Sequence, residues 1–329
     1  MENNKSIKNS DDNYDVLKKL IEENMEIFEL KELIGEGSES YVYKSIIKKI
    51  KKPVSMKIIY NNKKSKQNTK EIKIGNKLKN RYIIDCLGMK NIKQEKYDID
   101  CIILEYSKFG NLRHFQKYYL KKLYLSESLL CYFTYQILMG LKYCHLNKIV
   151  HYDIKPQNII IDSHLDLKII DFSICLDYKD KRNKIKLPCQ GTNHYMAPEV
   201  INSEEINIKD LEKIDLYSLG VMLYNFSCNS YPYESSNDST TNKSKSDENI
   251  NILELKHDSH YSKYFFDFLR NLLERDINKR FNIKQAMEHY WIKGAEILME
   301  EKEKVNNANI FLSYLIFDFF QNFNCYVCK

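Results

Sequence analysis

The sequence predicts an α+β protein built from two unequal parts. Residues 27–103 consist of short runs rich in β-branched and aromatic residues, interrupted by one helical stretch at residues 69–80. After Gly110 the periodicity becomes helical, and residues 126–147 place one apolar stripe along a helix, formed by Leu129, Phe133, Ile137, Leu141 and Cys144. With 329 residues and 43% hydrophobic content, the chain can bury a large core. We expect a small sheet with one helix, followed by a larger helical part.

Composition and charge argue against several classes of protein. The net charge is only +6 and basic residues are spread along the chain, whereas a nucleic-acid partner requires them on one element, so we expect no such partner. The most apolar stretch, residues 310–320, is too short to span a bilayer, and we expect no transmembrane segment. Nine scattered cysteines without a secretory leader predict an intracellular protein, cytoplasmic or nuclear. Cys325 and Cys328 lack further zinc ligands nearby, so two tail cysteines without a metal are the simpler interpretation.

Three segments are predicted to contribute little to the core. Residues 1–26 form a polar N-terminal extension, either solvated or a short helix. The insert at residues 235–249 is of low complexity and is expected to be a flexible loop, while residues 294–329 form a helical tail that becomes dense in aromatics. The resulting boundaries are a folded domain at 27–293, with its first part at 27–105 and its second at 108–293.

Candidate phosphate-binding residues lie in the small part. A glycine-rich turn between two predicted strands can bring backbone N–H groups close to phosphate oxygens, although paired glycines also occur in ordinary hairpins. Lys57 lies in an apolar β run, where a charge is costly without a partner, and Glu71 at the start of the helix is the expected partner. Such an ion pair aims the lysine at a polyphosphate. The residues of the turn are Ile34, Gly35, Glu36, Gly37, Ser38, Glu39, Ser40, Tyr41 and Val42.

A second set of candidates gathers an acid, a lysine and an amide on one loop. Asp153 can orient a substrate hydroxyl and accept its proton, Lys155 can neutralise a moving phosphoryl group, and the amide oxygen of Asn158 can bind Mg²⁺. Asp171 follows another short apolar run, and its carboxylate is a hard oxygen ligand for a metal that bridges phosphates. The pattern therefore indicates phosphoryl transfer.

These motifs, in this order, resemble the eukaryotic protein kinase family, and the resemblance covers residues 27–292. Residues 191–199 are similar to the end of the family's activation segment, residues 215–220 to the start of its buried central helix, and Arg280 to the arginine that pairs with the Glu199 position. The resemblance implies a bilobal protein kinase fold, a small β-rich N-lobe with one key helix and a larger helical C-lobe.

The same resemblance implies a function. It suggests a serine/threonine protein kinase that uses ATP and Mg²⁺ and acts on protein substrates, because Lys155 and Thr192 match the serine/threonine type. It implies catalytic roles for Asp153, Lys155, Lys57 and Glu71, and metal binding by Asn158 and Asp171. The adenine ring is expected to lie among Val42, Ser55, Leu104, Glu105, Ser107 and Ile160.

Several positions depart from the family pattern. Ser40 replaces the third glycine of the turn, which is a mild change, and Ser173 replaces the glycine after Asp-Phe, which narrows the backbone freedom there. Tyr152 stands where most members carry the arginine that receives an activation-loop phosphate. Between Ser173 and Thr192 the chain has no serine or threonine, and only Tyr178 could be phosphorylated. We therefore expect an enzyme that does not need activation-loop phosphorylation.

Two features leave alternatives open. Five basic residues of the activation loop, together with Gln157, indicate either a solvated loop or attraction of acidic substrates; they are Lys179, Lys181, Arg182, Lys184 and Lys186. Gly75 stands where the family places a large apolar side chain, so a regulatory partner or the chain's own tail is expected to fill a gap in the N-lobe. Phe320 and Phe323 resemble a motif with which some kinases dock that tail, although packing on the C-lobe is the simpler interpretation.

Two rival functions compete with the kinase interpretation. A pseudokinase, acting as an ATP-binding scaffold or allosteric partner, predicts loss of Lys57, Asp153 or Asp171, and all three are present. A small-molecule kinase of the same fold is disfavoured because residues 191–199, which serve a peptide-binding platform, are preserved.

Overall fold

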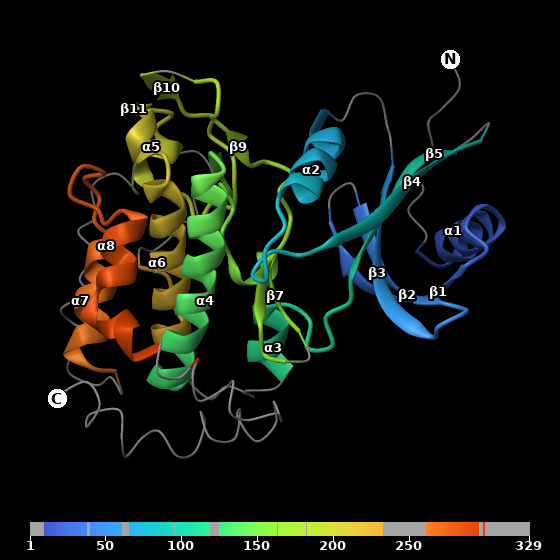
Figure 1. Cartoon of the computed structure of the whole chain (residues 1–329), viewed down its shortest axis with the longest axis horizontal. Coiled ribbons are helices and arrows are strands. Elements are labelled where there is room, and N and C mark those ends of the chain that lie inside the picture. Colours follow the sequence, from blue (N-terminus) through green and yellow to red (C-terminus); the bar gives the residue numbers. More distant parts are fainter. Residues whose placement is uncertain are drawn as a thin grey trace. The chain divides into compact units, whose positions relative to one another are not determined.

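The structure is a computed structural model of the whole chain (Figure 1). It describes residues 10–37, 40–60, 66–94, 97–118, 125–162, 164–181, 183–232 and 261–295, together with Met299. These residues form two compact units, the first up to Lys77 with Ile84–Tyr106, and the second comprising Leu78–Ile83 and the chain from Ser107 onward. Across these ranges, no helix combines the length and apolar character that crossing a membrane would require. The insert at 235–249, Phe320 and Phe323 lie outside the described residues.

The first unit contains an antiparallel sheet of five strands in the order β1-β2-β3-β5-β4, with one helix, α2, near the edge strand. Its elements are β1 (Phe28–Glu36), β2 (Ser40–Ile47), β3 (Lys52–Tyr60), α2 (Lys66–Lys77), β4 (Cys86–Gln94) and β5 (Tyr97–Glu105). Ile83 belongs to the second unit, where it forms an isolated parallel bridge with Ile169, and β4 begins only at Cys86. The predicted small sheet with one helix is otherwise present.

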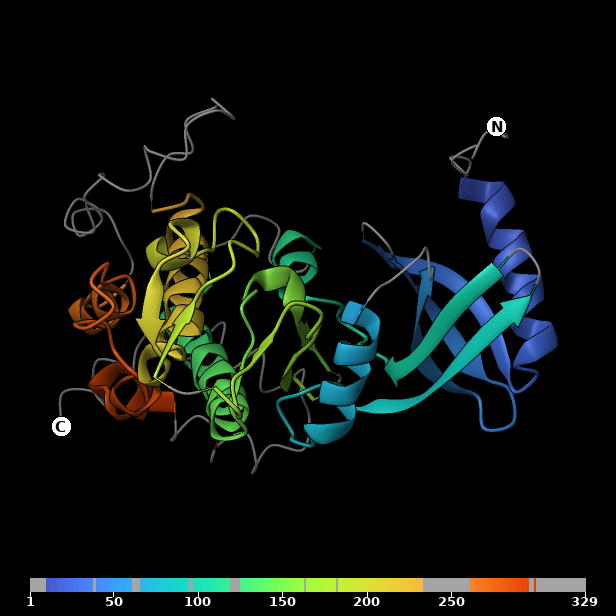
Figure 2. The same ribbon diagram turned by 90° about the horizontal axis from the view of Figure 1, so that it is seen from above.

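A helix near the N-terminus, α1 (Ser10–Asn24), adds to this sheet. Leu17, Leu20 and Ile21 are buried in one apolar cluster with β-strand side chains such as Leu30 and Met56. The helices α1 and α2 lie on opposite faces of the sheet (Figure 2). The expectation that this segment stays outside the core is therefore wrong for these side chains, because the polar composition of residues 1–26 concealed apolar residues at helical spacing.

The second unit is mainly helical, and α4, α6 and α7 run side by side within it (Figure 1). Buried side chains surround α4, so the single apolar stripe expected there was too narrow, and α6 is buried along almost its whole length. The helices are α3 (Leu112–Tyr118), α4 (Glu127–Leu146), α5 (Pro198–Ile201), α6 (Lys213–Cys228), α7 (Lys263–Leu272) and α8 (Ile283–Glu288). Short strands pair as β6 (Ile149–Val150) with β9 (Leu176–Asp177), β7 (Ile159–Ile161) with β8 (Leu167–Ile169), and β10 (Lys184–Lys186) with β11 (Glu205–Asn207).

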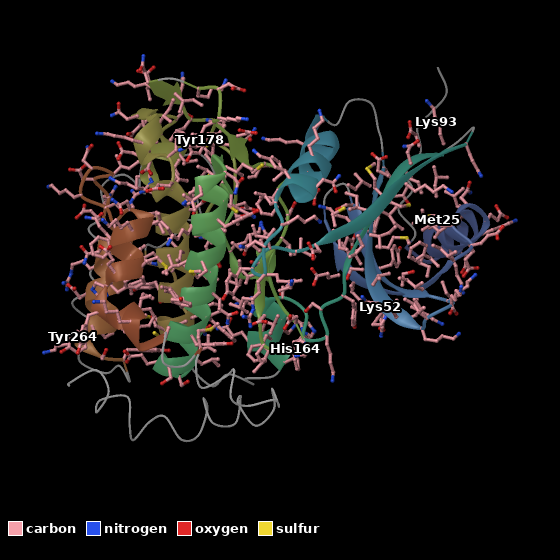
Figure 3. All side chains as sticks on the ribbon, in the orientation of Figure 1. Met25, Lys52, Lys93, His164, Tyr178 and Tyr264 are labelled. Carbon is pink, nitrogen blue, oxygen red and sulfur yellow. The ribbon has the colours of Figure 1, made fainter. Side chains whose placement is uncertain are left out.

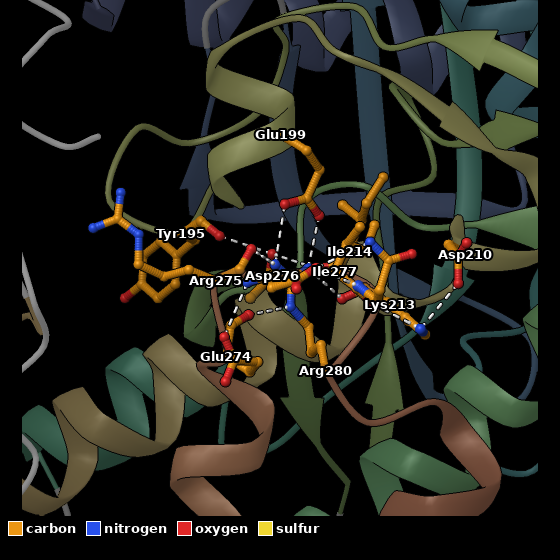
Figure 4. A network of polar contacts seen from close by, with 12 residues as sticks. Tyr195, Glu199, Asp210, Lys213, Ile214, Glu274, Arg275, Asp276, Ile277 and Arg280 are labelled. Atoms are coloured by element: carbon orange, nitrogen blue, oxygen red, sulfur yellow. Dashed lines mark hydrogen bonds and ion pairs between the residues drawn. The ribbon is translucent and has the colours of Figure 1, made fainter. Parts of the chain in front are cut away.

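A buried ion pair ties α5 to the segment before α8. The guanidinium of Arg280 donates to the two carboxylate oxygens of Glu199 over 2.7 and 3.0 Å, and both side chains are almost fully buried. Arg280 also donates to the backbone carbonyls of Glu274 and Lys213 (Figure 4). The pairing predicted from the sequence is present, and it fixes the end of the segment that leads to α5.

Candidate functional site

In the first unit, Lys57 and Glu71 form an ion pair. The ammonium of Lys57 lies 2.7 and 2.8 Å from the two carboxylate oxygens of Glu71. Lys57 is in β3, and alternation along the strand turns its side chain away from the apolar cluster that holds Met56 and Ile58. The pair joins the sheet to α2 and leaves the charge of each group compensated. This pairing was predicted from the sequence and is present.

The glycine-rich turn connects β1 to β2 in the same unit. The strands approach it in register, with Gly35 opposite Val42 and Glu36 opposite Tyr41. The N–H of Gly37 donates to the carbonyl of Ser40 over 2.8 Å, and a Cβ on Gly37 would lie 3.1 Å from the Ser40 hydroxyl oxygen. Ile34 is exposed at the end of β1. Ser38 and Glu39 lie outside the described residues.

The residues expected around adenine are divided between the two units. Ser55 and Leu104 are cross-strand neighbours in the sheet, and the Glu105 carboxylate accepts a hydrogen bond from the Asp85 N–H over 2.8 Å. In the second unit the hydroxyl of Ser107 donates to the carbonyls of Gly110 and Ile161, and the neighbouring Ile160 is buried. The contact of these residues with adenine stays a prediction.

In the second unit, the carboxylate of Asp153 is held by three side chains. One oxygen, Oδ2, lies 2.6 Å from the ammonium of Lys155 and accepts a hydrogen bond from the amide of Asn158 over 2.9 Å. The other, Oδ1, accepts from the hydroxyl and the N–H of Thr192 over 2.7 and 3.1 Å. The acid, lysine and amide expected from the sequence are therefore brought together, with one orientation of the carboxylate fixed.

Buried polar contacts shape the loop that carries Asp153. The carboxylate of Asp215, at the start of α6, accepts from the N–H groups of His151 and Tyr152 over 2.9 and 2.8 Å. The ring of His151 receives the N–H of Asp153 at Nδ1 and contacts the carbonyl of Ile170 through Nε2. Two segments far apart in the sequence, at Ile170 and at Asp215, therefore hold the backbone of this loop.

Comparison with known proteins identifies the family. A family model described as "Protein kinase domain" matches residues 28–292. The chain belongs to the protein kinase family. The fold expected from the sequence, a bilobal α+β kinase fold with a β-sheet N-lobe and a helical C-lobe, is thereby confirmed. The first unit corresponds to the N-lobe and the second to the C-lobe of this kinase.

Several curated kinases resemble the chain at modest identity. It is 29% identical over 287 residues to Aurora kinase B of Drosophila melanogaster, which covers 84% of this chain and 82% of that protein. It is 29% identical over 270 residues to an Aurora kinase of Patiria pectinifera, covering 80% of this chain and 62% of the relative. It is 31% identical over 269 residues to the fatty acyl-CoA synthetase and RNA processing-associated kinase 1 of Saccharomyces cerevisiae, covering 78% and 30%. The kinase therefore spans less than two thirds of two of these relatives.

The residues expected to bind Mg²⁺ offer oxygen ligands of the right kind. Both bonds of the Asn158 amide nitrogen go to Asp153, one to its carboxylate and one to its carbonyl over 2.8 Å. Within the described residues no donor bonds the Asn158 amide oxygen, which leaves it as an acceptor for a hard cation. The N–H of Ile170 donates to the Asn158 carbonyl over 2.9 Å, so Asp171 follows directly from a residue tied to Asn158. The donor set of this kinase fits magnesium.

The backbone around Asp171 also fits the sequence departures. Asp171 adopts a left-handed conformation with φ of 66°, which is uncommon for a residue with a Cβ and marks a functional or strained position. Ser173 is outside the left-handed region, so a serine is accommodated there without strain. The ring of Phe172 packs on that of His151 with centroids 4.9 Å apart.

Two polar residues contribute contacts to the site that the sequence did not indicate. Thr192 contacts both Asp153 and Lys155, and its hydroxyl lies 2.7 Å from each. Asp215 orients the backbone of the catalytic loop. Both lie in segments that resemble the family, but no local pattern shows that residues 39 positions apart, such as Asp153 and Thr192, meet.

Proposed function

We propose that this kinase transfers the γ-phosphate of ATP to serine or threonine hydroxyls of protein substrates. The observation that carries the proposal is the carboxylate of Asp153, oriented by Lys155, Asn158 and Thr192. A carboxylate held in this way can accept the hydrogen of a substrate hydroxyl and aim its oxygen for an in-line attack. Lys155 and Thr192, which match the serine/threonine type, support the choice of acceptor.

Each remaining residue has a role in this proposal. When bound, Mg²⁺ supplies neutralisation of phosphate charge, and Asn158 and Asp171 would hold it. Lys57, fixed by Glu71, places the polyphosphate, while the turn from Ile34 to Val42 offers backbone N–H groups to it. Lys155 steadies the group being transferred. Val42, Ser55, Leu104, Glu105, Ser107 and Ile160 surround the adenine ring in this proposal.

The proposal includes activity without a phosphate on the activation loop. Tyr178, labelled in Figure 3, is buried and its hydroxyl donates to the carbonyl of His145 at the end of α4 over 3.2 Å. Burial raises the pKa of Tyr178 to about 12, which keeps this hydroxyl protonated. A kinase would have to unfold this region to reach it. Phosphatase treatment is expected to leave the rate unchanged, and a rate that falls with the loss of phosphotyrosine would contradict this part of the proposal.

Acidic proteins are the substrate class that the activation loop favours. Lys179, Lys181, Lys184 and Lys186 are exposed and form no ion pair with any described residue; Arg182 lies outside the described part. Positive charge around a site raises the local concentration of anionic partners and weakens with added salt. An acidic peptide is expected to have a lower KM than a neutral one, and the difference should shrink in salt; equal KM values would leave the loop as a solvated surface.

A regulatory partner or the chain's own tail is proposed to act on the N-lobe. A Cβ added at Gly75 meets only the Cβ of Cys86, at 3.7 Å, which supports the gap expected there. Gly75→Leu is expected to fill it and to raise the activity of the isolated kinase. An unchanged or lower rate, with α2 intact by circular dichroism, would argue against a missing apolar group.

An intracellular location, cytoplasmic or nuclear, is also proposed for this kinase. It is supported by the seven cysteines of the described residues, all of which are free thiols. Microscopy of a tagged full-length chain tests it, and secretion would contradict it.

A transfer assay with radiolabelled ATP and Mg²⁺ tests the central proposal. Wild type should label serine or threonine, while Asp153→Asn should bind ATP but transfer little. If neither wild type nor Asp153→Asn transfers phosphate while both still bind ATP, the rival function is favoured, a pseudokinase that works as an ATP-binding scaffold.

A further inference from the structure

The side chain of Tyr152 links the catalytic loop to the activation segment. Its hydroxyl donates to the carbonyl of Pro188 over 3.1 Å, and the residue is almost fully buried, with 3% of its surface exposed. We propose that Tyr152 is a positioning residue: its neutral hydrogen bond holds residues 188–192 beside Asp153, where the family pairs an arginine with a phosphate. The inference rests on the proposed function and names how that site is kept in its active arrangement.

The backbone of Tyr152 is held in an unusual conformation that supports this role. Its φ is 75°, a left-handed value that a bulky residue rarely adopts unless its surroundings impose it. Those surroundings include the carboxylate of Asp215, which accepts the Tyr152 N–H over 2.8 Å. From this held backbone the side chain of Tyr152 reaches the carbonyl of Pro188.

A second contact from the same residue brackets the segment. Gly191 packs against the carbonyl oxygen of Tyr152, which would lie 3.2 Å from a Cβ at position 191. Gly191 has a φ of 122°, which glycine adopts without strain. Tyr152 therefore contacts Pro188 through its hydroxyl and lies close to Gly191 through its carbonyl, and the next residue, Thr192, reaches Asp153.

The chemistry of the contact suits a permanent link. Burial raises the pKa of Tyr152 well above its ordinary value, so its hydroxyl remains a donor throughout the physiological range. The acceptor is a backbone carbonyl, which needs no modification, and the chain offers no serine or threonine between Ser173 and Thr192. An arginine at position 152 would instead bury a charge that requires an anion beside it. The phenol of Tyr152 can hold the segment in place without an anion beside it.

The stretch that Tyr152 contacts lies between two parts of the segment that are anchored by other elements. On the N-terminal side, β10 pairs with β11 and the N–H of Leu187 donates to the carbonyl of Glu204 over 2.9 Å. On the C-terminal side, the ion pair between Glu199 and Arg280 anchors α5. The Tyr152 contacts lie between these two anchors.

Tyr152→Phe removes the hydroxyl and keeps the ring. Tyr261→Phe is the matched control, because Tyr261 is also buried and donates to a backbone carbonyl, that of Leu125, over 2.7 Å. Amide hydrogen exchange, followed by mass spectrometry, should become faster at residues 189–192 in Tyr152→Phe and stay unchanged there in Tyr261→Phe. Peptide kcat/KM should fall about 3-fold to 10-fold in Tyr152→Phe alone, as expected for one neutral hydrogen bond, with the KM for ATP unchanged.

Equal exchange and equal kinetics in the two variants would overturn the proposal, as would a loss in Tyr152→Phe that appears only in the KM for ATP. Failure of the proposed function has a different signature, since wild type itself would then transfer no phosphate. The exchange comparison would still decide the role of Tyr152 in that case.

Discussion

The hydroxyl of Thr192 donates to the Oδ1 oxygen of Asp153 over 2.7 Å, and the N–H of Thr192 donates to the same oxygen over 3.1 Å. Lys155 completes the arrangement, because its ammonium lies 2.7 Å from the Thr192 hydroxyl oxygen and 2.6 Å from Oδ2 of Asp153. The orientation of the proposed catalytic carboxylate therefore depends on a residue from the activation segment.

Thr192→Val keeps the shape of the side chain and removes its hydroxyl. We expect kcat/KM for a peptide to fall about ten-fold to a hundred-fold, because a hydrogen bond to a charged group contributes about 1.5–3 kcal/mol. Thr192→Ser restores a hydroxyl and should recover most of the rate. Steady-state kinetics test both, and equal rates for the valine and serine variants would contradict the role of the hydroxyl.

Glu71→Gln leaves the Lys57 ammonium without its opposite charge. The two contacts between these residues, at 2.7 and 2.8 Å, then lose their ionic character. The Lys57 ammonium is held less firmly and positions ATP less well. We expect a fall of about ten-fold or more in kcat/KM for ATP, based on the strength of charged hydrogen bonds. Glu22→Gln, on the partly exposed surface of α1, is the control and should leave the kinetics for ATP unchanged.

Leu17→Ala should destabilise the N-lobe, because Leu17 is fully buried between α1 and the sheet. The loss of a buried leucine side chain costs about 2–5 kcal/mol. Val16, the adjacent residue, has 40% of its surface exposed, and Val16→Ala should change the free energy of unfolding by less than about 0.5 kcal/mol. Urea unfolding measures both, and similar losses would mean that α1 does not pack as described.

Arg280→Met should destabilise the C-lobe strongly, because it leaves the buried carboxylate of Glu199 without a counter-charge. We expect a loss of about 3–5 kcal/mol. Arg270 forms an ion pair of 3.8 Å with Asp267 on the surface, so Arg270→Ala serves as a control with an expected loss of about 0–1 kcal/mol. A loss for Arg280→Met as small as that of the control would contradict the burial of this pair (Figure 4).

Glu127 should make stability depend on pH. Its carboxylate accepts bonds from Ser262 and from the indole N–H of Trp291, yet burial outweighs these bonds and raises the pKa of Glu127. A folded-state pKa above the unfolded value gives stability that is complete below the unfolded pKa and is lost as pH rises through the folded pKa. Glu127→Gln should remove this loss.

Urea unfolding of wild type and Glu127→Gln from about pH 4 to about pH 8 measures the effect. The variant should gain stability relative to wild type as the pH rises across this window. A difference between the two proteins that stays constant with pH would show that Glu127 titrates alike in the folded and unfolded chains.

The sequence was sufficient for most of the fold because local periodicity determined most elements. The expected helix at residues 126–147 became α4, Glu127–Leu146, with Ser126 as its N-cap. The prediction from the sequence failed where contacts with neighbouring elements outweigh the local sequence pattern. Residues 1–26 average as polar, but Leu17, Leu20 and Ile21 repeat at helical spacing and bind to the sheet.

The site was predictable where one loop carries several groups, and less so where distant segments meet. Asp153, Lys155 and Asn158 share a loop, so their spacing in the sequence already indicates their grouping. The link from Tyr152 to Pro188 spans 36 positions. The missing arginine showed that something had changed at position 152, but the new partner of its side chain depends on the backbone angle at Tyr152, which the sequence does not reveal.

Because of helix α1, the part of the chain that packs into the N-lobe core is longer than the part that matches the kinase family. The family match begins at residue 28, after α1 has already covered one face of the sheet. A recombinant fragment cut at that boundary would present Leu30, Met56 and their neighbours to water, and exposed apolar faces of this kind promote self-association. The boundary of the family match therefore differs from the boundary of the folded part of the chain. A fragment that begins at the family boundary, without α1, would be insoluble.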